Sequence, residues 1–190
     1  MNALARLARR ALPFAAFAAV LAWGTPAHAS TSDSMQISVT PSVTYGVQIS
    51  SPMAGGYQFG TVALGASTES TAAITVTNSG TVSEFFSMAI TNTSGGWQAS
   101  TSTPTTDRFR MTAEFSGTQP NISTGFLTSD ALTTSAPLTA ATLYGQAGVM
   151  TPPAGSNTQK LWLKLEMPPL LNSGTTGGQT MTVTIVGQAN

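Results

Sequence analysis

Residues 57–80, YQFGTVALGASTESTAAITVTNSG, contain the pattern that decides the fold. Tyr57 and Phe59 flank a polar position, and two glycines then interrupt the chain. Across 71–77 apolar residues alternate with threonines, as expected for a half-buried β-strand. The closing Asn-Ser-Gly at 78–80 suits a tight turn, because Asn and Gly tolerate positive φ. This stretch therefore predicts a strand, a turn and a second strand.

The chain begins like an export signal. Three arginines precede an apolar stretch at 11–23, and Ala-His-Ala at 27–29 matches an A-x-A cleavage site. The apolar stretch is shorter than the ~20 residues that span a bilayer, so a cleaved signal helix is favoured over a retained anchor. We expect residues 1–29 to be removed, and no later stretch is apolar enough to span a membrane. The protein is then secreted, either extracellular or periplasmic.

The mature chain, residues 30–190, is mildly acidic and poor in charge. It keeps four basic and seven acidic residues, so its net charge is 4 − 7 = −3. A surface of this kind has no electrostatic footprint for nucleic acid. The one histidine, His28, lies in the signal, and the chain has no cysteine. The usual zinc and copper ligands, cysteine nucleophiles and imidazole bases are therefore missing.

The alternation seen in 57–80 recurs along the chain. Residues 35–49 carry apolar side chains at odd positions, and Pro41 divides them into two short strands or one bent edge strand. Further strands are expected at 84–91, 107–115, 160–167 and 181–186. Their predicted inward faces are Phe86, Met88 and Ile90; Phe109, Met111, Ala113 and Phe115; Leu161, Leu163, Leu165 and Met167; and Met181, Val183 and Ile185. No stretch after the signal has a helical period.

Many short strands at this spacing predict an all-β fold. We expect a single domain over 30–190 that forms an antiparallel two-sheet sandwich of about 8–10 strands, Ig-like or jelly-roll. Residues 116–159 form a loop-rich insertion, with short strands expected at 126–132 and 138–144. A chain this rich in Thr and Ser could also be disordered, but its regular alternation and spaced aromatics favour folding.

Charged residues concentrate on the outer faces of two predicted strands. If these strands pair, opposite charges become neighbours across the ladder. The row is either a recognition patch or an ordinary solvated face; its members are Arg108, Arg110 and Glu114 on one strand, and Lys160, Lys164 and Glu166 on the other. Trp162 lies in the same row, where it either contacts a ligand or is covered by the 116–159 insertion.

No catalytic, cofactor-binding or metal-ligating residue is predicted. Glu114 and Glu166 could be a glycosidase pair only if a cleft brought them ~5–10 Å apart, and their basic neighbours favour ion pairing instead. Ser67 lacks the second glycine of a nucleophile elbow. The three aspartates of the mature chain are isolated, without the spacing of a calcium loop.

The sequence Phe59-Gly60-Thr61-Val62, followed by Gly65 and by ITVTNSG at 74–80, resembles the "F-G-x-V-x-x-G … v-T-v-x-N-x-G" pattern of bacterial Ig-like surface and periplasmic modules. The exit of the second strand is also similar to that of TasA/camelysin-type fibre subunits. This resemblance implies a β-sandwich with a structural or adhesive role. It carries no catalytic residues.

The sequence thus predicts an exported, non-enzymatic structural or interaction module. Its terminal strands, 35–49 and 181–186, could add to the sheet edge of a protein partner or of a second copy, as in a filament or surface layer. The alternative is a carbohydrate-binding or adhesion module that uses the aromatic side chains of Trp97, Trp162 or Tyr144. The candidate binding residues are Trp162, Trp97, Arg108, Arg110 and Lys164.

Overall fold

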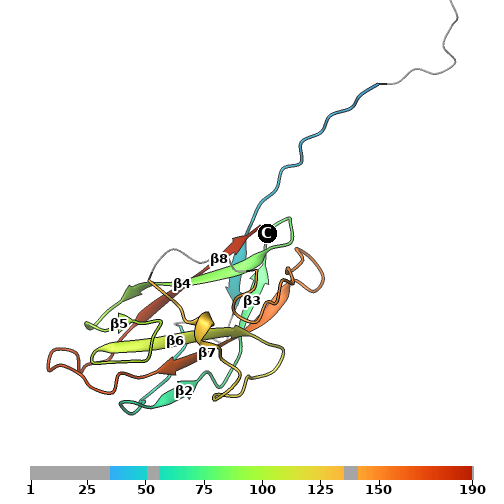
Figure 1. Ribbon diagram of the computed structural model, residues 1–190. Helices are drawn as coiled ribbons and strands as arrows, with labels where there is room; N and C mark the ends of the chain where they lie inside the picture. The colour runs from blue at the N-terminus through green and yellow to red at the C-terminus, as the bar shows by residue number, and fades with distance from the viewer. Residues whose placement is uncertain (1–34, 51–55, 135–140, 190) are drawn as a thin grey trace, which may run out of the picture. The chain divides into compact units, whose positions relative to one another are not determined.

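The computed structural model describes residues 35–50, 56–134 and 141–189. The expected signal, 1–29, lies outside these residues. The chain divides into two units, residues 1–40 and residues 41–190. In the first unit, the described residues 35–40 have no regular secondary structure and are exposed. The second unit contains every named strand (Figure 1).

The described residues contain eight β-strands and one short 3-10 helix, η1 (Thr128–Asp130), so the all-β prediction is confirmed. The strands, in chain order, are β1 (Val47–Ser50), β2 (Ser67–Glu69), β3 (Ile74–Asn78), β4 (Phe85–Thr93), β5 (Gln98–Ala99), β6 (Arg108–Phe115), β7 (Thr158–Glu166) and β8 (Met181–Gln188). No α-helix occurs among these residues, which agrees with the absence of a helical period in the sequence.

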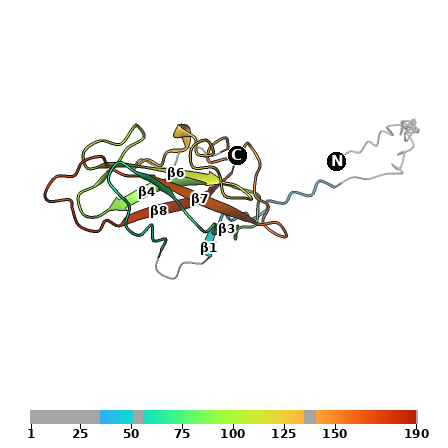
Figure 2. The ribbon, with the colours of Figure 1, turned by 90° about the horizontal axis from the view of Figure 1, so that it is seen from below.

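The strands form two sheets. The larger has six strands in the order β1-β3-β7-β6-β5, with β2 also paired to β7, and the smaller consists of β4 and β8. All pairings are antiparallel except the short β5–β6 pairing, which is parallel and departs from the predicted all-antiparallel arrangement. In the view of Figure 2, β6 of the larger sheet lies above β8 of the smaller sheet.

β2 and β3 lie on the same edge of β7, one after the other. Between them, Ser70 continues the contact with β7: its N–H donates to the carbonyl of Leu163 at 2.7 Å, and its hydroxyl accepts the N–H of Leu163 at 3.0 Å. Ser70 is completely buried. β2 and β3 therefore flank β7 like a single strand that is interrupted between Glu69 and Ile74.

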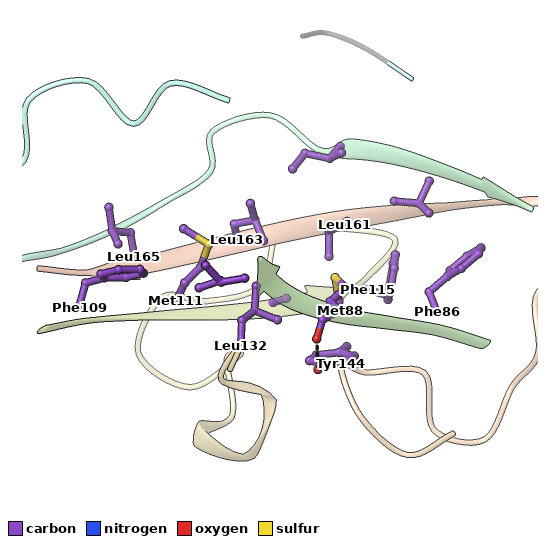
Figure 3. Close-up of a cluster of buried hydrophobic side chains, with 14 of the residues drawn as sticks. Phe86, Met88, Phe109, Met111, Phe115, Leu132, Tyr144, Leu161, Leu163 and Leu165 are labelled. Carbon is purple, nitrogen blue, oxygen red and sulfur yellow. Dashed lines mark hydrogen bonds between the residues drawn. The ribbon is translucent and has the colours of Figure 1, made fainter. Parts of the chain in front are cut away.

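The hydrophobic core lies between the two sheets, and the alternating pattern of the sequence predicted it (Figure 3). The predicted inward residues of β4, β6 and β7 are all buried in one cluster, whereas those of β8 pack against it and are only partly buried. Tyr144 joins this cluster, and its hydroxyl donates to the carbonyl of Met88 at 3.2 Å. Apolar side chains on strands of both sheets therefore supply the burial that stabilises the fold.

β3 ends where the turn after 71–77 was predicted, but neither Asn78 nor Gly80 adopts the positive φ expected there. β3 ends at Asn78, whose side-chain oxygen accepts the N–H of Gly80 at 2.8 Å. Its amide nitrogen donates to the carbonyls of Val82 and Thr151, each at 2.8 Å. Asn78 is completely buried, so these bonds satisfy a polar side chain that would otherwise destabilise the interior.

Several predicted strands are absent. Residues 57–59 do not form a strand, although Phe59 packs against the core, and the first strand of this region is β2, in a stretch predicted to turn. Of residues 35–49, only 47–49 lie in a strand. Residues 126–132 form η1 and an isolated bridge at Ala131 instead of a strand. In the predicted strand 138–144, the described residues 141–144 form turns, and 138–140 lie outside the described residues.

Candidate functional site

Three members of the charged row on β6 and β7, namely Arg110, Lys164 and Glu166, form ion pairs with one another. The two strands pair antiparallel and bring opposite charges together, as expected: Arg110 lies opposite Glu166, and its guanidinium bonds the Glu166 carboxylate. Lys164 lies 3.3 Å from the same carboxylate. These contacts hold the pKa of Glu166 below its ordinary value, chiefly through the Arg110 hydrogen bond. The side chains of Arg110, Lys164 and Glu166 are largely buried. Of the three cations predicted to bind a ligand, Arg108, Arg110 and Lys164, only Arg108 at the start of β6 is exposed.

The two tryptophans are buried. The Trp162 indole N–H donates to the carbonyl of Ser116 at 3.0 Å, so this residue lies under the start of the 116–159 insertion. The Trp97 indole N–H donates to the carbonyl of Thr175 at 3.0 Å, and its ring packs on Phe109. A sugar stacks on an aromatic ring through an exposed face, which neither ring offers here. Tyr144, the third aromatic considered for glycan binding, is 1% exposed.

Glu114 and Asp130 lie near the turn at Tyr144 and Gly145, and the pKa of each acid is raised. Asp130 is buried and accepts the backbone N–H of Tyr144, while burial raises its pKa. Burial, helped by the charge of Asp130, raises the pKa of Glu114 to about 7. Gly145 lies against the Glu114 carboxylate, where a Cβ would collide with it. The Glu114 carboxylate is thus packed against a glycine turn and lies close enough to Asp130 for the charge of Asp130 to act on it.

Glu114 and Glu166 do not form a glycosidase pair. Glu166 is opposite Arg110, and Glu114 is four residues further along β6, opposite Trp162. Four residues of strand span roughly 13 Å. Each acid also has its own neighbours, Arg110 and Lys164 for Glu166 and Asp130 for Glu114. In the part of the chain that the structure describes, no group of three or more acidic, His or Cys side chains could hold a metal.

A buried carboxylate connects the two sheets near β1. Glu84, just before β4, is completely buried, and its Oε2 accepts the N–H of Gly46 at 3.2 Å. Its other oxygen has no hydrogen-bond partner, and burial raises its pKa. Gly187 on β8 has no room for a Cβ because the Glu84 carboxylate occupies that space. Glu84 therefore fixes the approach of β8 and the segment leading into β1.

One edge of the smaller sheet is covered by the protein itself. Along the edge of β4 that faces away from β8, every second residue bonds the 131–151 segment. Glu84 exchanges backbone hydrogen bonds with Thr151, at 3.0 and 2.8 Å, and the carbonyl of Thr133 accepts the N–H of Ile90 at 2.8 Å. Between them the side chains of Gln146 and Tyr144 bond the backbone of Phe86 and Met88. β4 is therefore closed to a further strand.

The same segment also covers the edge of β6 that faces away from β7, beyond the residues that pair with β5. The carbonyl of Met111 accepts the N–H of Leu132 at 2.8 Å, and the carbonyl of Tyr144 accepts the N–H of Phe115 at 2.8 Å. The described residues 131–134 and 141–151 therefore bond both β6 and β4 and close this side of the two sheets. The insertion predicted to be loops is a structural cover.

The opposite side is not closed in this way. Within residues 35–50, 56–134 and 141–189, β8 pairs only with β4, and β1 pairs only with β3. Neither β1 nor β8 contains a charged residue, although charges are what natural edge strands commonly use to prevent pairing. Ile49 is 53% exposed and Val186 is 38% exposed. We take the unpaired edge of β8, together with β1, as the candidate site, and call it the open edge.

A second unusual surface lies next to β1 in the sequence. Met35, Ile37 and Val39 are 80–85% exposed, the most exposed of the large apolar side chains in the described chain. They alternate with Gln36, Ser38 and Thr40, the pattern of a strand with one buried face. Residues 35–40 therefore have the alternating side chains of a β-strand, but no strand of the described chain pairs with them.

The sequence indicated the terminal strands as interaction elements, but it could not show which edges are free. The covering of β4 depends on a side-chain amide at Gln146, which no strand pattern reveals. Among the described residues no helix has the length and apolar character needed to cross a membrane. Comparison of the sequence with models of protein families and with curated proteins gave no match.

Proposed function

We propose that this protein is an exported, non-enzymatic interaction module of the cell surface or periplasm that self-associates through its open edge. The observation that carries the proposal is the contrast between the two outer edges of the smaller sheet: the outer edge of β4 is covered by residues 131–134 and 141–151, whereas the outer edge of β8 has no paired strand in the described chain, and β8 is uncharged. Unpaired backbone donors and acceptors on such an edge are a template for a further strand.

Several further features support this function. The pairing of Arg110 with Glu166 and the burial of Trp97 and Trp162 leave few side chains on the surface for small-ligand recognition. The same proposal includes three predictions from the sequence: an Ig-like or jelly-roll sandwich, a cleaved signal over 1–29 and a resemblance to fibre subunits. Each agrees with a secreted protein that acts through its surface rather than through a reaction.

The test is the oligomeric state of the protein, expressed from its full-length gene and purified from the compartment that holds it. Sedimentation velocity over a wide concentration range and negative-stain electron microscopy should show association. Thr182→Lys places a charge on the exposed face of β8 and should reduce it, whereas Thr118→Lys, in an exposed loop, should not. A protein that stays monomeric at every concentration would argue against self-association.

A further inference from the structure

The inward side chains of β8 are less buried than those of its partner strand, β4. Met88 and Ile90 on β4 are each 1% exposed, whereas Ile185 and Val183, opposite them on β8, are only partly buried. A two-stranded sheet is also marginal by itself. A further strand beside β8 would extend the sheet and cover the inward side chains that remain partly exposed.

The occupant must supply apolar side chains at every second position and carry no charge. Residues 35–40, MQISVT, meet both requirements, because Met35, Ile37 and Val39 alternate with three uncharged polar residues. Their apolar side chains are exposed, and no hydrogen bond in the described chain involves their backbone. Burying each of them is favourable, since apolar surface is then removed from water.

The chain that follows residues 35–40 is anchored to the folded unit and keeps Thr40 extended. The backbone carbonyls of Thr44 and Gly46 accept the N–H groups of Thr81 and Ser79, each at 2.9 Å, so the start of β1 is fixed. Only residues 41–43 separate this anchor from Thr40. Pro41 favours extended backbone at Thr40, the conformation that an added strand needs.

We infer that residues 35–40 of one copy add as a strand to the free edge of β8 of a second copy. This inference rests on the proposed function and specifies its partner and its interface. Donor and acceptor are different parts of the chain, so the contact is heterologous, and each copy can give one strand and receive another. Repetition of such a contact builds a chain of subunits or closes a ring.

A pair of matched substitutions tests the donor segment. Ile37→Lys places a charge on the face that would be buried and should weaken self-association about 100-fold. Ser38→Lys places the same charge on the opposite face and should leave association within a few-fold of the original. Because residues 35–40 lie outside the unit that contains the strands, both variants should keep the original melting temperature.

Introduced cysteines test the pairing itself, because the chain has none of its own. Ser38→Cys in one tagged copy should form a disulfide with Thr182→Cys, Thr184→Cys or Val186→Cys in a differently tagged copy, at one of these positions above the others. Ile37→Cys should not, because its side chain would point to the other face of the sheet.

The outcomes separate this inference from the proposed function. Self-association that is unchanged by Ile37→Lys, with no disulfide between copies, would overturn the inference and leave the interaction module intact. In a chain that carries both Ser38→Cys and a β8 cysteine, disulfides that form only within single chains would also overturn the inference, because residues 35–40 would then cover their own β8. A strictly monomeric protein would contradict both.

Discussion

The side chain of Gln146 bonds the backbone of Phe86 in the way that a neighbouring strand would. Its oxygen accepts the Phe86 N–H at 2.8 Å, and its nitrogen donates to the Phe86 carbonyl at 2.7 Å. Gln146 is buried, and so is Phe86. One amide side chain therefore replaces a strand at the centre of the covered edge of β4.

Replacing Gln146 should destabilise the protein and uncover this edge. Gln146→Leu leaves two buried backbone groups without partners, which should lower the free energy of unfolding by about 2–4 kcal/mol. Denaturant unfolding measures this loss, and light scattering should show more aggregation because the edge of β4 becomes available. Gln119→Leu, at an exposed amide that bonds Glu69 and the carbonyl of Ser70, should cost less than about 1 kcal/mol. Equal losses for the two variants would contradict this role.

Glu114 should make stability fall as the pH rises. Its pKa of about 7 in the folded protein lies above the ordinary 4.5, because burial and the charge of Asp130 disfavour the ionised form. Between these pH values the folded state binds more protons than the unfolded state, so the free energy of unfolding decreases with rising pH and levels off above pH 7. After allowance for solvent screening, we expect a loss of about 1–2 kcal/mol.

Glu114→Gln keeps the shape of the side chain and removes its titration, so unfolding curves from pH 5 to pH 8 should show a weaker dependence. Asp130 and Glu84 also have raised pKa values and leave a residual slope of the same sign. The pH profile of Asp130→Asn should shift as well, since the pKa of Glu114 falls when its charged neighbour is removed. Coincident profiles for Glu114→Gln and the original protein would refute the assignment.

The long strands could be predicted from the sequence because burial on one face leaves a period of two. β6 buries every second side chain from Phe109 to Phe115, and β7 does so from Leu161 to Leu165, which is enough to fix their core faces. The position of the turn at 78–80 was also predictable, because Asn and Gly are common turn residues and the Asn side chain can bond the backbone two residues ahead.

Short elements and the candidate site could not be predicted in this way. β2, with the sequence Ser-Thr-Glu, is a strand only because β7 offers it an edge, while Tyr57 and Phe59 alternate correctly but pack without pairing. The free and covered edges depend on contacts between distant residues, such as Gln146 with Phe86. A local pattern identifies a strand but does not show what lies beside it.

Trp162 should behave as a structural residue. Trp162→Phe removes the donor to the carbonyl of Ser116 and reduces the packed volume, so we expect a loss of about 1–3 kcal/mol in the free energy of unfolding. Tyr45→Leu, at a half-exposed aromatic, should change stability by less than about 0.5 kcal/mol. Thermal unfolding followed by circular dichroism compares the two. Loss of binding on a glycan array by Trp162→Phe, at unchanged stability, would instead support the carbohydrate-binding alternative.

Gly80 should be intolerant of even one added carbon. A Cβ there would lie 2.5 Å from the backbone carbonyl oxygen of Thr44, which the N–H of Thr81 holds in place, so the chain itself would have to move. We expect Gly80→Ala to lower the free energy of unfolding by about 1–3 kcal/mol, measured by urea titration. Gly117→Ala is the matched control, because a Cβ there meets nothing within 4 Å, and it should change stability by less than about 0.5 kcal/mol. The same stability for both variants would show that the segment before β1 can separate from the turn after β3, and would remove the fixed anchor on which delivery of residues 35–40 to a second copy depends.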